Sequence, residues 1–219
     1  MKKLVIFGTG DFADIVTDLA VRTGFQVNGY LIDDEFYDGN ENRKNGLPIV
    51  PFSQAGECFP AGEYGAAVGM IGQDMQTARE AVFNKLKSMG YELPNIVHPS
   101  AVIGSAAMGE GNIILEGCVL GFSASIGNAN IMWSLSAINH HGRAGSFNNF
   151  SPGSTTAGGA VVGSHCFLGV NCSVNNRITV SDYTLAGAGT YIAKTTEPYG
   201  VYVPERAIKL NKTSLEMKL

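Results

Sequence analysis

The sequence predicts a small Rossmann-like parallel α/β domain followed by a left-handed parallel β-helix. Two observations support this division. Short apolar strands alternate with amphipathic helices over roughly the first 93 residues, which is the pattern of an open parallel sheet. From residue 95 onward a six-residue repeat replaces the helical period. We therefore expect an α/β domain at 1–94, a β-helix at 95–193 and a C-terminal tail at 194–219.

The α/β domain begins with an apolar strand at residues 4–7. A helix should start near Asp11, because apolar residues follow at helical spacing and Gly24 supplies a C-terminal stop. The polar, turn-rich residues 34–46 are predicted to form an exposed loop. The remaining elements expected in this domain are a strand at 27–32, a strand at 66–70 and a helix at 75–89.

Aliphatic residues recur every six positions from Met108 to Ile192. Fifteen consecutive positions hold this phase without an insertion, and only Thr156 among them is not apolar. Small residues dominate the positions that follow, and residues 101–193 contain only five charged side chains. This pattern describes a triangular coil in which three hexads make one turn, so each inward residue stacks on the one 18 positions later. A β-sandwich is disfavoured, because its turns would break the phase.

The repeat stops after Ile192, and the residues that follow are charged and mixed. We expect this tail to leave the β-helix, cross its last coil and end in a short helix around residues 214–218.

Charge and cysteine content exclude several classes of protein. Lys and Arg number 15 against 19 acidic residues, a net charge near −4, so nothing favours binding to nucleic acid or to an anionic membrane. The N-terminal apolar run is too short for a signal peptide, and no stretch approaches the roughly 20 apolar residues of a membrane span. We expect a cytoplasmic protein with buried free cysteines, because no CxxC pair is present.

Several motifs, together with the unbroken hexads, resemble those of one enzyme family. They are VIFGTG at 5–10, IVHPSA at 96–101 and CFLGVN at 166–171. With them the chain resembles the bacterial sugar acetyltransferases of the left-handed β-helix superfamily, which act on nucleotide-linked amino sugars or on sialic acids. The resemblance implies a homotrimer with acetyl-CoA in the groove between neighbouring β-helices. It also implies that the N-terminal domain of one subunit holds the nucleotide sugar.

The segment Gly8-Thr9-Gly10-Asp11-Phe12-Ala13 fits the glycine-rich turn between a strand and a helix. Such a turn lets a phosphate approach the backbone and the positive end of the helix. Alternatively, the glycines only tighten the turn. The candidate substrate contacts are Gly8, Gly10, Asp11 and Gly69, with Asp33 or Asp34 at the position of a ribose-binding acid; Asp34 could equally be a solvated loop residue.

His140 is the candidate general base. It follows the inward Ile138 by two positions, so its side chain should point outward. Transfer of an acyl group to an amine or hydroxyl requires removal of a proton, and histidine suits this near neutral pH. His140 aligns with the base of the family, but His141 stands where the family commonly has Asp or Glu. Glu116 from a neighbouring coil could take that role, the base could be weaker, or the substrate could differ.

The coenzyme A contacts implied by the resemblance are Asn149, Gly158, Val170 and Gly187. The amide of Gly158 would donate to the thioester oxygen. A histidine is familiar at the position of Asn149, and the coil needs small residues at many of these places anyway. We expect no metal, because His165 is one turn and one face away from His141.

These residues support three hypotheses. The leading one is an acetyl-CoA-dependent N-acetyltransferase for a nucleotide-linked amino sugar. The second is an O-acetyltransferase for a sugar such as sialic acid, which would use the same base. The third is a non-catalytic scaffold that binds a nucleotide sugar.

Overall fold

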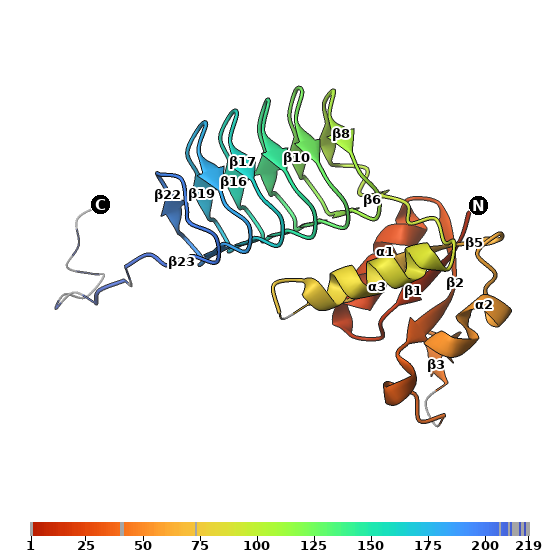
Figure 1. The fold of residues 1–219 in the computed structure, drawn as a ribbon. Coiled ribbons are helices and arrows are strands. Elements are labelled where there is room, and N and C mark those ends of the chain that lie inside the picture. Colours follow the sequence, from red (N-terminus) through yellow and green to blue (C-terminus); the bar gives the residue numbers. More distant parts are fainter. Residues whose placement is uncertain are drawn as a thin grey trace.

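The computed structural model describes residues 2–39, 42–72, 74–205, 207–209, 211, 215 and 217. The chain forms an α/β domain at one end and a stack of triangular coils that extends away from it (Figure 1). No described helix is both long enough and apolar enough to cross a membrane.

The α/β domain is built on a five-stranded sheet of order β3-β4-β2-β1-β5, parallel except for the β3–β4 pair. Its strands are β1 (Lys2–Phe7), β2 (Phe25–Ile32), β3 (Arg43–Lys44), β4 (Leu47–Pro51) and β5 (Tyr64–Val68). Its helices are α1 (Asp11–Arg22), η1 (Asp34–Phe36), η2 (Phe52–Gln54), α2 (Ala55–Cys58) and α3 (Thr77–Ser88). The α/β architecture predicted from the sequence is therefore confirmed.

One expectation for this domain is wrong. Residues 34–46 are not a simple loop, because they contain η1 and the short strand β3, which forms a hairpin with β4. The sequence does not indicate the strand β4, because Pro48 and Pro51 interrupt its apolar pattern. It is nevertheless a parallel neighbour of β2.

The β-helix consists of two-residue strands in three parallel sheets. Sheet I contains β6 (Ile96–Val97), β9 (Ile113–Ile114), β12 (Ile131–Met132), β15 (Asn149–Phe150), β18 (Phe167–Leu168), β21 (Leu185–Ala186) and β23 (Val201–Tyr202). Sheet II contains β7 (Val102–Ile103), β10 (Val119–Leu120), β13 (Ala137–Ile138), β16 (Thr155–Thr156), β19 (Ser173–Val174) and β22 (Tyr191–Ile192). Sheet III contains β8 (Ala107–Met108), β11 (Ser125–Ile126), β14 (Arg143–Ala144), β17 (Val161–Val162) and β20 (Thr179–Val180).

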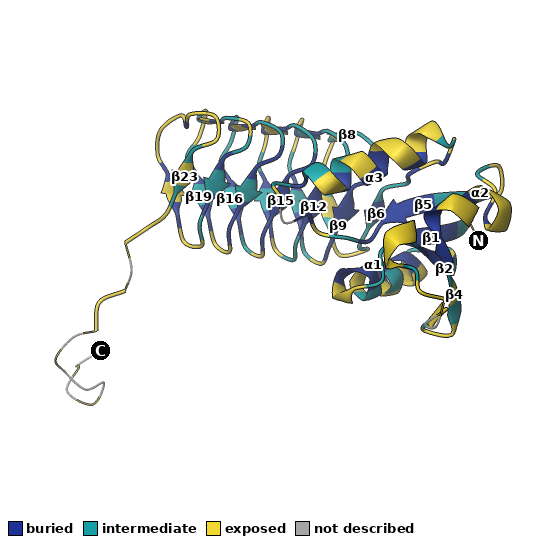
Figure 2. Ribbon diagram, turned by 60° about the horizontal axis from the view of Figure 1, so that its bottom comes forward, coloured by how far each residue is buried: buried dark blue, intermediate teal, exposed yellow. Residues whose placement is uncertain are grey.

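From β8 to β22, successive strands in each sheet pair residues 18 positions apart, as the hexad pattern predicts. At the two ends the spacing is shorter: β6 pairs with β9 and β7 with β10 at 17 positions, and β21 pairs with β23 at 16. Met132 pairs with Phe150, and Phe150 pairs with Leu168. All three side chains are fully buried, and dark blue segments that mark buried residues recur from coil to coil along the stack in Figure 2. The second strand residue of each hexad thus forms the core.

A ladder of buried asparagines adds polar contacts at one corner. Asn112, Asn130 and Asn148 are 18 residues apart. Asn112 Oδ1 accepts from the backbone of Asn130 at 2.9 Å, and Asn130 Oδ1 accepts from the backbone of Asn148 at 3.0 Å. Asn148 continues the ladder to the amide of Cys166 at 2.7 Å. The corner amides are therefore satisfied although they are buried.

The cysteines are free thiols. Cys118, Cys166 and Cys172 are buried, and burial raises the pKa of Cys166 and Cys172 to about 11. Cys58 is exposed, so the expectation that all four are buried is wrong for this residue. It lies at the end of a single-turn helix, where the chain reaches the surface.

Arg79 joins the two parts of the molecule. Its side chain is fully buried on α3, and Nη1 donates to the carbonyls of Val68 and Met70 at 2.7 Å each. Nε donates to the carbonyl of Ala129 in the β-helix at 3.2 Å. Burial lowers the pKa of this guanidinium. The carboxyl end of β5 is thereby fixed to the coils.

The C-terminal tail begins with an ordered segment. Val201–Tyr202 pairs with β21, so this part of the expected tail extends sheet I beyond the last complete turn. The helix expected around residues 214–218 lies outside the described residues.

Candidate active site

His140 lies at the corner between sheets II and III, and its side chain is exposed. The coil positions it because Ile138, two residues earlier, is fully buried in the core. Asn139 fixes the intervening backbone by donating through Nδ2 to the carbonyl of Thr156 at 2.7 Å. The register thus presents the imidazole to solvent from a rigid strand end.

His141 occupies the left-handed turn of the same corner, with φ of 58°. The residue three positions after each inward residue has a positive φ throughout the described coils, from Gly111 to Gly189. His140 Nδ1 lies 3.1 Å from His141 Nδ1, and the two rings are nearly perpendicular. Phe122, one coil earlier, packs edge-on against His141 with ring centroids 5.6 Å apart. The neighbour of His140 is therefore another imidazole.

Gly158 lies directly against the His140 ring. A Cβ at this position would lie 2.3 Å from both Cε1 and Nε2 of His140, so a larger residue requires the ring to move. Within the described backbone, the Gly158 amide donates no hydrogen bond. A pocket of about 410 Å³ surrounds this pair and is lined by His140, His141, Gly158, Gly159, Asn176 and Arg177. The corner therefore brings a candidate base next to a free N–H donor.

Glu116 lies at a different corner, between sheets I and II. Its carboxylate accepts from Ser134 Oγ at 3.0 Å and lies 3.8 Å from His98 Nε2. Hydrogen bonding to its own backbone N–H and to Ser134, with the nearby His98, lowers the pKa of Glu116. Within one chain, the structure does not bring Glu116 to His140. The acid expected beside the base is thus not supplied by the same subunit.

The glycine-rich turn forms at the carboxyl ends of β1 and β5. Gly8 has φ of 111°, and a Cβ there would lie 2.8 Å from the Gly69 carbonyl oxygen. A Cβ at Gly69 would lie 2.5 Å from Ile6 Cγ2, so close packing requires glycine at both positions. Gly10 caps α1, and a Cβ there would meet nothing within 4 Å. Asp11 begins α1 and is exposed. The open position at Gly10 and the helix N-terminus can accept an anion.

The two acids after β2 have local hydrogen bonds. Asp34 accepts from the backbone N–H of Ser53 at 3.2 Å and from the Ser53 hydroxyl, and the hydroxyl bond lowers the pKa of Asp34. Asp33 occupies the N-cap position of η1 without a capping bond from its side chain, and its backbone carbonyl accepts from the Phe36 N–H at 3.0 Å. Both residues thus stabilise the turn that follows β2.

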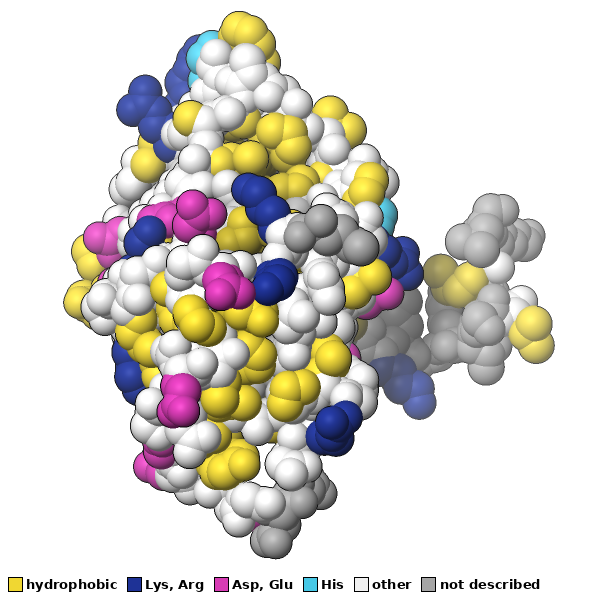
Figure 3. Space-filling model, turned by 90° about the vertical axis from the view of Figure 1, so that its right-hand side faces the viewer, with side chains coloured by type: hydrophobic (Ala, Val, Ile, Leu, Met, Phe, Trp, Pro, Cys, Tyr) yellow, Lys and Arg dark blue, Asp and Glu magenta, His cyan; other side chains and the backbone are white. Residues whose placement is uncertain are grey.

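A pocket that sequence reasoning missed lies beside this turn. It measures about 260 Å³ and is lined by Thr9, Ile32, Phe36, Tyr37, Asp38, Arg43, Lys44 and Ile49. Neither Asp33 nor Asp34 lines it. Lys44 is held by Asp14 at 2.9 Å, and Arg43 donates to the Gly46 carbonyl at 2.6 Å. Adjacent basic residues in a turn-rich segment were the available signal. In Figure 3, basic and acidic side chains are interspersed on the face that turns toward the viewer.

Most of the predicted coenzyme A contacts lie along sheet I. Asn149 is buried on β15 and accepts from Trp133 Nε1 at 2.9 Å. It lines a mostly apolar pocket of about 290 Å³ with residues of the loop that precedes α3. Val170 is exposed at the corner after β18, and Gly187 follows β21. Only Gly158 shares the corner of His140, so one chain divides the predicted contacts between two faces.

His165 is buried, and both of its ring nitrogens lie close to residues of the α/β domain. It is buried between Phe147 and Tyr183, with ring centroids 5.2 and 4.6 Å away. Its Nδ1 lies 2.9 Å from the Met75 carbonyl oxygen, and its Nε2 lies 3.3 Å from Glu80. The described residues contain no group of three or more His, Cys, Asp or Glu side chains that could hold a metal ion. His165 instead fastens α3 to the coils.

Solved structures with the same architecture include a perosamine N-acetyltransferase and an acetyltransferase domain. PerB from Caulobacter crescentus, determined with CoA and GDP-perosamine, matches with a TM-score of 0.82 and 25% identity over 92% of this chain and 94% of that chain. The acetyltransferase domain of PglB from Neisseria gonorrhoeae FA1090 matches with a TM-score of 0.82 and 21% identity over 96% and 100%. WeeI from Acinetobacter baumannii AYE gives 0.65 and 16% over 92% and 96%.

No protein-family model matches the chain. The similarity to PglB and WeeI concerns the fold, and the similarity to PerB covers both parts of the chain. The resemblance predicted from the motifs is thereby confirmed: the chain is a structural match to the left-handed β-helix sugar N-acetyltransferases.

Proposed function

We propose that this chain is an acetyl-CoA-dependent N-acetyltransferase that acts on a nucleotide-linked amino sugar, with His140 as the general base. The observation that carries the proposal is the His140 corner. An exposed imidazole lies against Gly158, whose N–H is free, in a chain with the architecture of PerB. The structure of PerB contains CoA and GDP-perosamine.

The α/β domain supports binding of a nucleotide sugar. The N-terminus of α1 at Gly10 and Asp11 is open to a phosphate, and the helix dipole favours negative charge there. The neighbouring pocket presents Arg43 and Lys44 together with the aromatic residues Phe36 and Tyr37. Cationic side chains can bind a diphosphate, and aromatic side chains can stack on a nucleobase. We therefore assign the nucleoside to this pocket and the phosphates to the N-terminus of α1. Thr9, which lines the pocket and precedes Gly10, lies between the two positions.

The residues at the His140 corner account for the chemistry. Acetyl-CoA supplies a thioester carbonyl that is attacked by the amine of the sugar, with loss of the CoA thiolate. His140 Nε2 takes the proton that the amine loses and can return it to the departing thiolate. The Gly158 N–H can stabilise the negative charge that develops on the thioester oxygen. This chemistry requires no metal.

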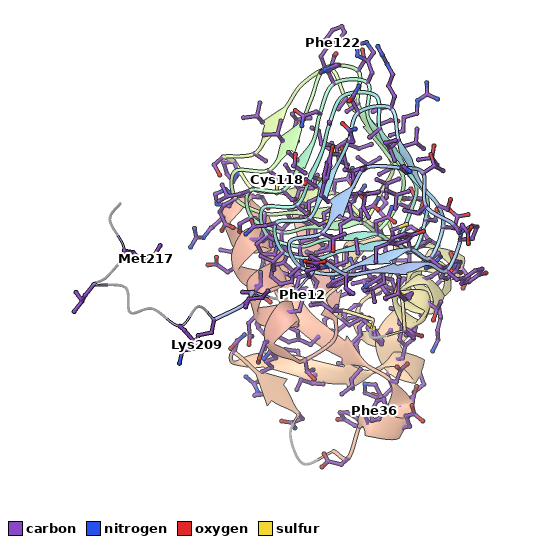
Figure 4. The ribbon with its side chains drawn as sticks, turned by 90° about the vertical axis from the view of Figure 1, so that its left-hand side faces the viewer. Phe12, Phe36, Cys118, Phe122, Lys209 and Met217 are labelled. Carbon is purple, nitrogen blue, oxygen red and sulfur yellow. The ribbon has the colours of Figure 1, made fainter. Side chains whose placement is uncertain are left out.

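The separation of the two halves of the site supports assembly as a homotrimer. In Figure 4, Phe122, which packs on His141, lies at the apex of the coil, whereas Phe36 of the nucleotide pocket lies at the opposite end of the molecule. A single chain thus keeps its base away from its nucleotide pocket. A neighbouring subunit that places its His140 corner against the Asn149 face would complete the site. Acetyl-CoA would then lie in the groove between the two β-helices.

The test is release of CoA thiol from acetyl-CoA in the presence of nucleotide-linked amino sugars, GDP-linked ones included. We expect His140→Ala to lose roughly 10²–10⁴-fold in rate. Its melting temperature should still rise with both ligands, because the variant retains the binding surfaces. Unchanged thiol release in His140→Ala would rule out His140 as the base.

The choice of acceptor in the assay distinguishes N-acetylation from O-acetylation. A matched sugar nucleotide with a hydroxyl in place of the amine should release no thiol if the enzyme is an N-acetyltransferase. Release with the hydroxyl compound or with free sialic acid alone would establish O-acetylation. Stabilisation by a nucleotide sugar without thiol release from any acceptor would identify a binding scaffold.

A further inference from the structure

His141 stands beside the candidate base with a geometry that allows only one kind of hydrogen bond. The two Nδ1 atoms are 3.1 Å apart, so one of them must carry the proton and the other must accept it. The nearly perpendicular rings leave the Nε2 of His140 on the side of Gly158. The contact between the imidazoles therefore determines which nitrogen of His140 is free to act.

We propose that His141 is a positioning residue, which accepts a hydrogen bond from His140 Nδ1–H and so keeps His140 Nε2 unprotonated and facing the substrate. This inference rests on the proposed function. In this arrangement His141 carries its own proton on Nε2. When His140 takes the proton of the amine, its Nδ1–H bond to His141 persists, and the positive charge is shared with a second imidazole. The proton then leaves through Nε2 to the thiolate, which restores the starting tautomers.

No carboxylate competes for this role within the described part of one chain. The lining of the pocket contains no Asp or Glu, and its only other charged side chain is Arg177, two coils further along the same corner. The coil before contributes Phe122, which has no charge. Glu116 is held at another corner by Ser134. The base of this chain thus works beside a neutral group and a cation.

A neutral acceptor has a consequence for the pH dependence of the reaction. A carboxylate beside an imidazole favours its charged form, so an acidic neighbour makes a base take up its proton at higher pH. No carboxylate lines the pocket of His140 within the described part of one chain, so a charged imidazole lacks this stabilisation. We expect activity to persist toward lower pH than when an acid stands at position 141.

The backbone at this corner allows a clean set of variants. Glycine occupies the equivalent left-handed position at Gly111, Gly117, Gly153, Gly159 and Gly189, so His141→Gly fits the turn without strain. His141→Asn and His141→Asp also tolerate a positive φ and retain an acceptor oxygen. Ser123→Gly is the matched control, because Ser123 has φ of 54° in the same corner one coil earlier.

The measurements are kcat, KM for both substrates and the pH profile of kcat/KM, on the full chain. His141→Gly should lose roughly 10- to 100-fold in kcat, less than His140→Ala, with little change in KM. Added imidazole should restore part of this loss. His141→Asp should retain activity and move the acidic limb of the profile up by about one pH unit. Ser123→Gly should behave as the wild type.

Nitrogen NMR of the imidazoles tests the pairing without an assay of activity. We expect a proton on Nδ1 of His140 and on Nε2 of His141. In His141→Gly, both neutral tautomers of His140 should be populated. The opposite tautomers, or wild-type kcat and pH profile in His141→Gly, would overturn the proposal. Absence of thiol release by the wild type would instead refute the proposed function, whatever the tautomers.

Discussion

The β-helix and the α/β domain of this chain use their sequences in different ways. In the β-helix, each inward residue contacts its equivalents 18 positions away, so one short period specifies core, corner and outward face. In the α/β domain, the important contacts join elements far apart in sequence, such as Arg79 with Ala129 and Lys44 with Asp14. Positions in the periodic β-helix therefore follow from counting residues, whereas the binding pocket at the edge of the α/β domain depends on tertiary contacts.

The stacked core should be the most sensitive part of the molecule. Phe150 is fully buried between Met132 and Leu168, so Phe150→Ala removes contacts with both neighbouring coils. We expect a loss of about 3–5 kcal/mol in the free energy of unfolding, measured by urea denaturation. A loss below about 1 kcal/mol would show that the coils do not depend on this column of side chains.

The sequence allowed the hexad phase, the outward position of His140 and the main strands and helices of the α/β domain to be predicted. It did not allow β4 to be predicted, because two prolines interrupt the strand pattern. The pocket that contains Arg43 and Lys44 was not predictable either. The placement of Glu116 away from His140 follows from the corner that each residue occupies, and counting hexads could have found it. The role of Arg79 could not be predicted, because its acceptors include carbonyls on other elements.

A substitution at Gly158 tests whether the active-site corner of the β-helix requires packing as close as that of its core. Gly158→Ala places a Cβ where the His140 ring lies, and the ring must move. A displacement of about 1 Å can reduce a catalytic rate roughly 100-fold, so we expect a loss of that order in kcat. Full activity in Gly158→Ala would show that close contact between the ring and this backbone is not needed.

Arg79 tests the connection between the two regions. Arg79→Met leaves three carbonyls without their donor. It also removes a buried charge, whose desolvation destabilises the folded state. We expect a net loss of about 1–3 kcal/mol, with Arg79→Lys intermediate, from urea unfolding curves. A more stable methionine variant would show that burial of the charge outweighs its hydrogen bonds.

The hairpin next to the nucleotide pocket should show the smallest effect. Hydrogen bonds from Lys44 and Asn45 lower the pKa of Asp14 in the folded chain. The stabilisation is therefore present above the unfolded value near 4 and is lost as the pH falls through the lower folded value. Because the Asp14 side chain is 47% exposed and solvent screens its interaction with Lys44, Asp14→Asn should cost less than about 1 kcal/mol at pH 7. A difference from wild type that grows as the pH falls would contradict this assignment.

If the base of one subunit acts on the substrate bound by another, mixed trimers of two different variants should show it. Gly10→Glu should block the phosphate site without disturbing the fold, because the position is open and an acid suits a helix N-terminus. His140→Ala removes the base, so each variant alone should be inactive. We predict that co-expressed, co-purified mixtures of the two regain thiol release. Verified mixed trimers without activity would contradict the shared site and place base and nucleotide within one chain.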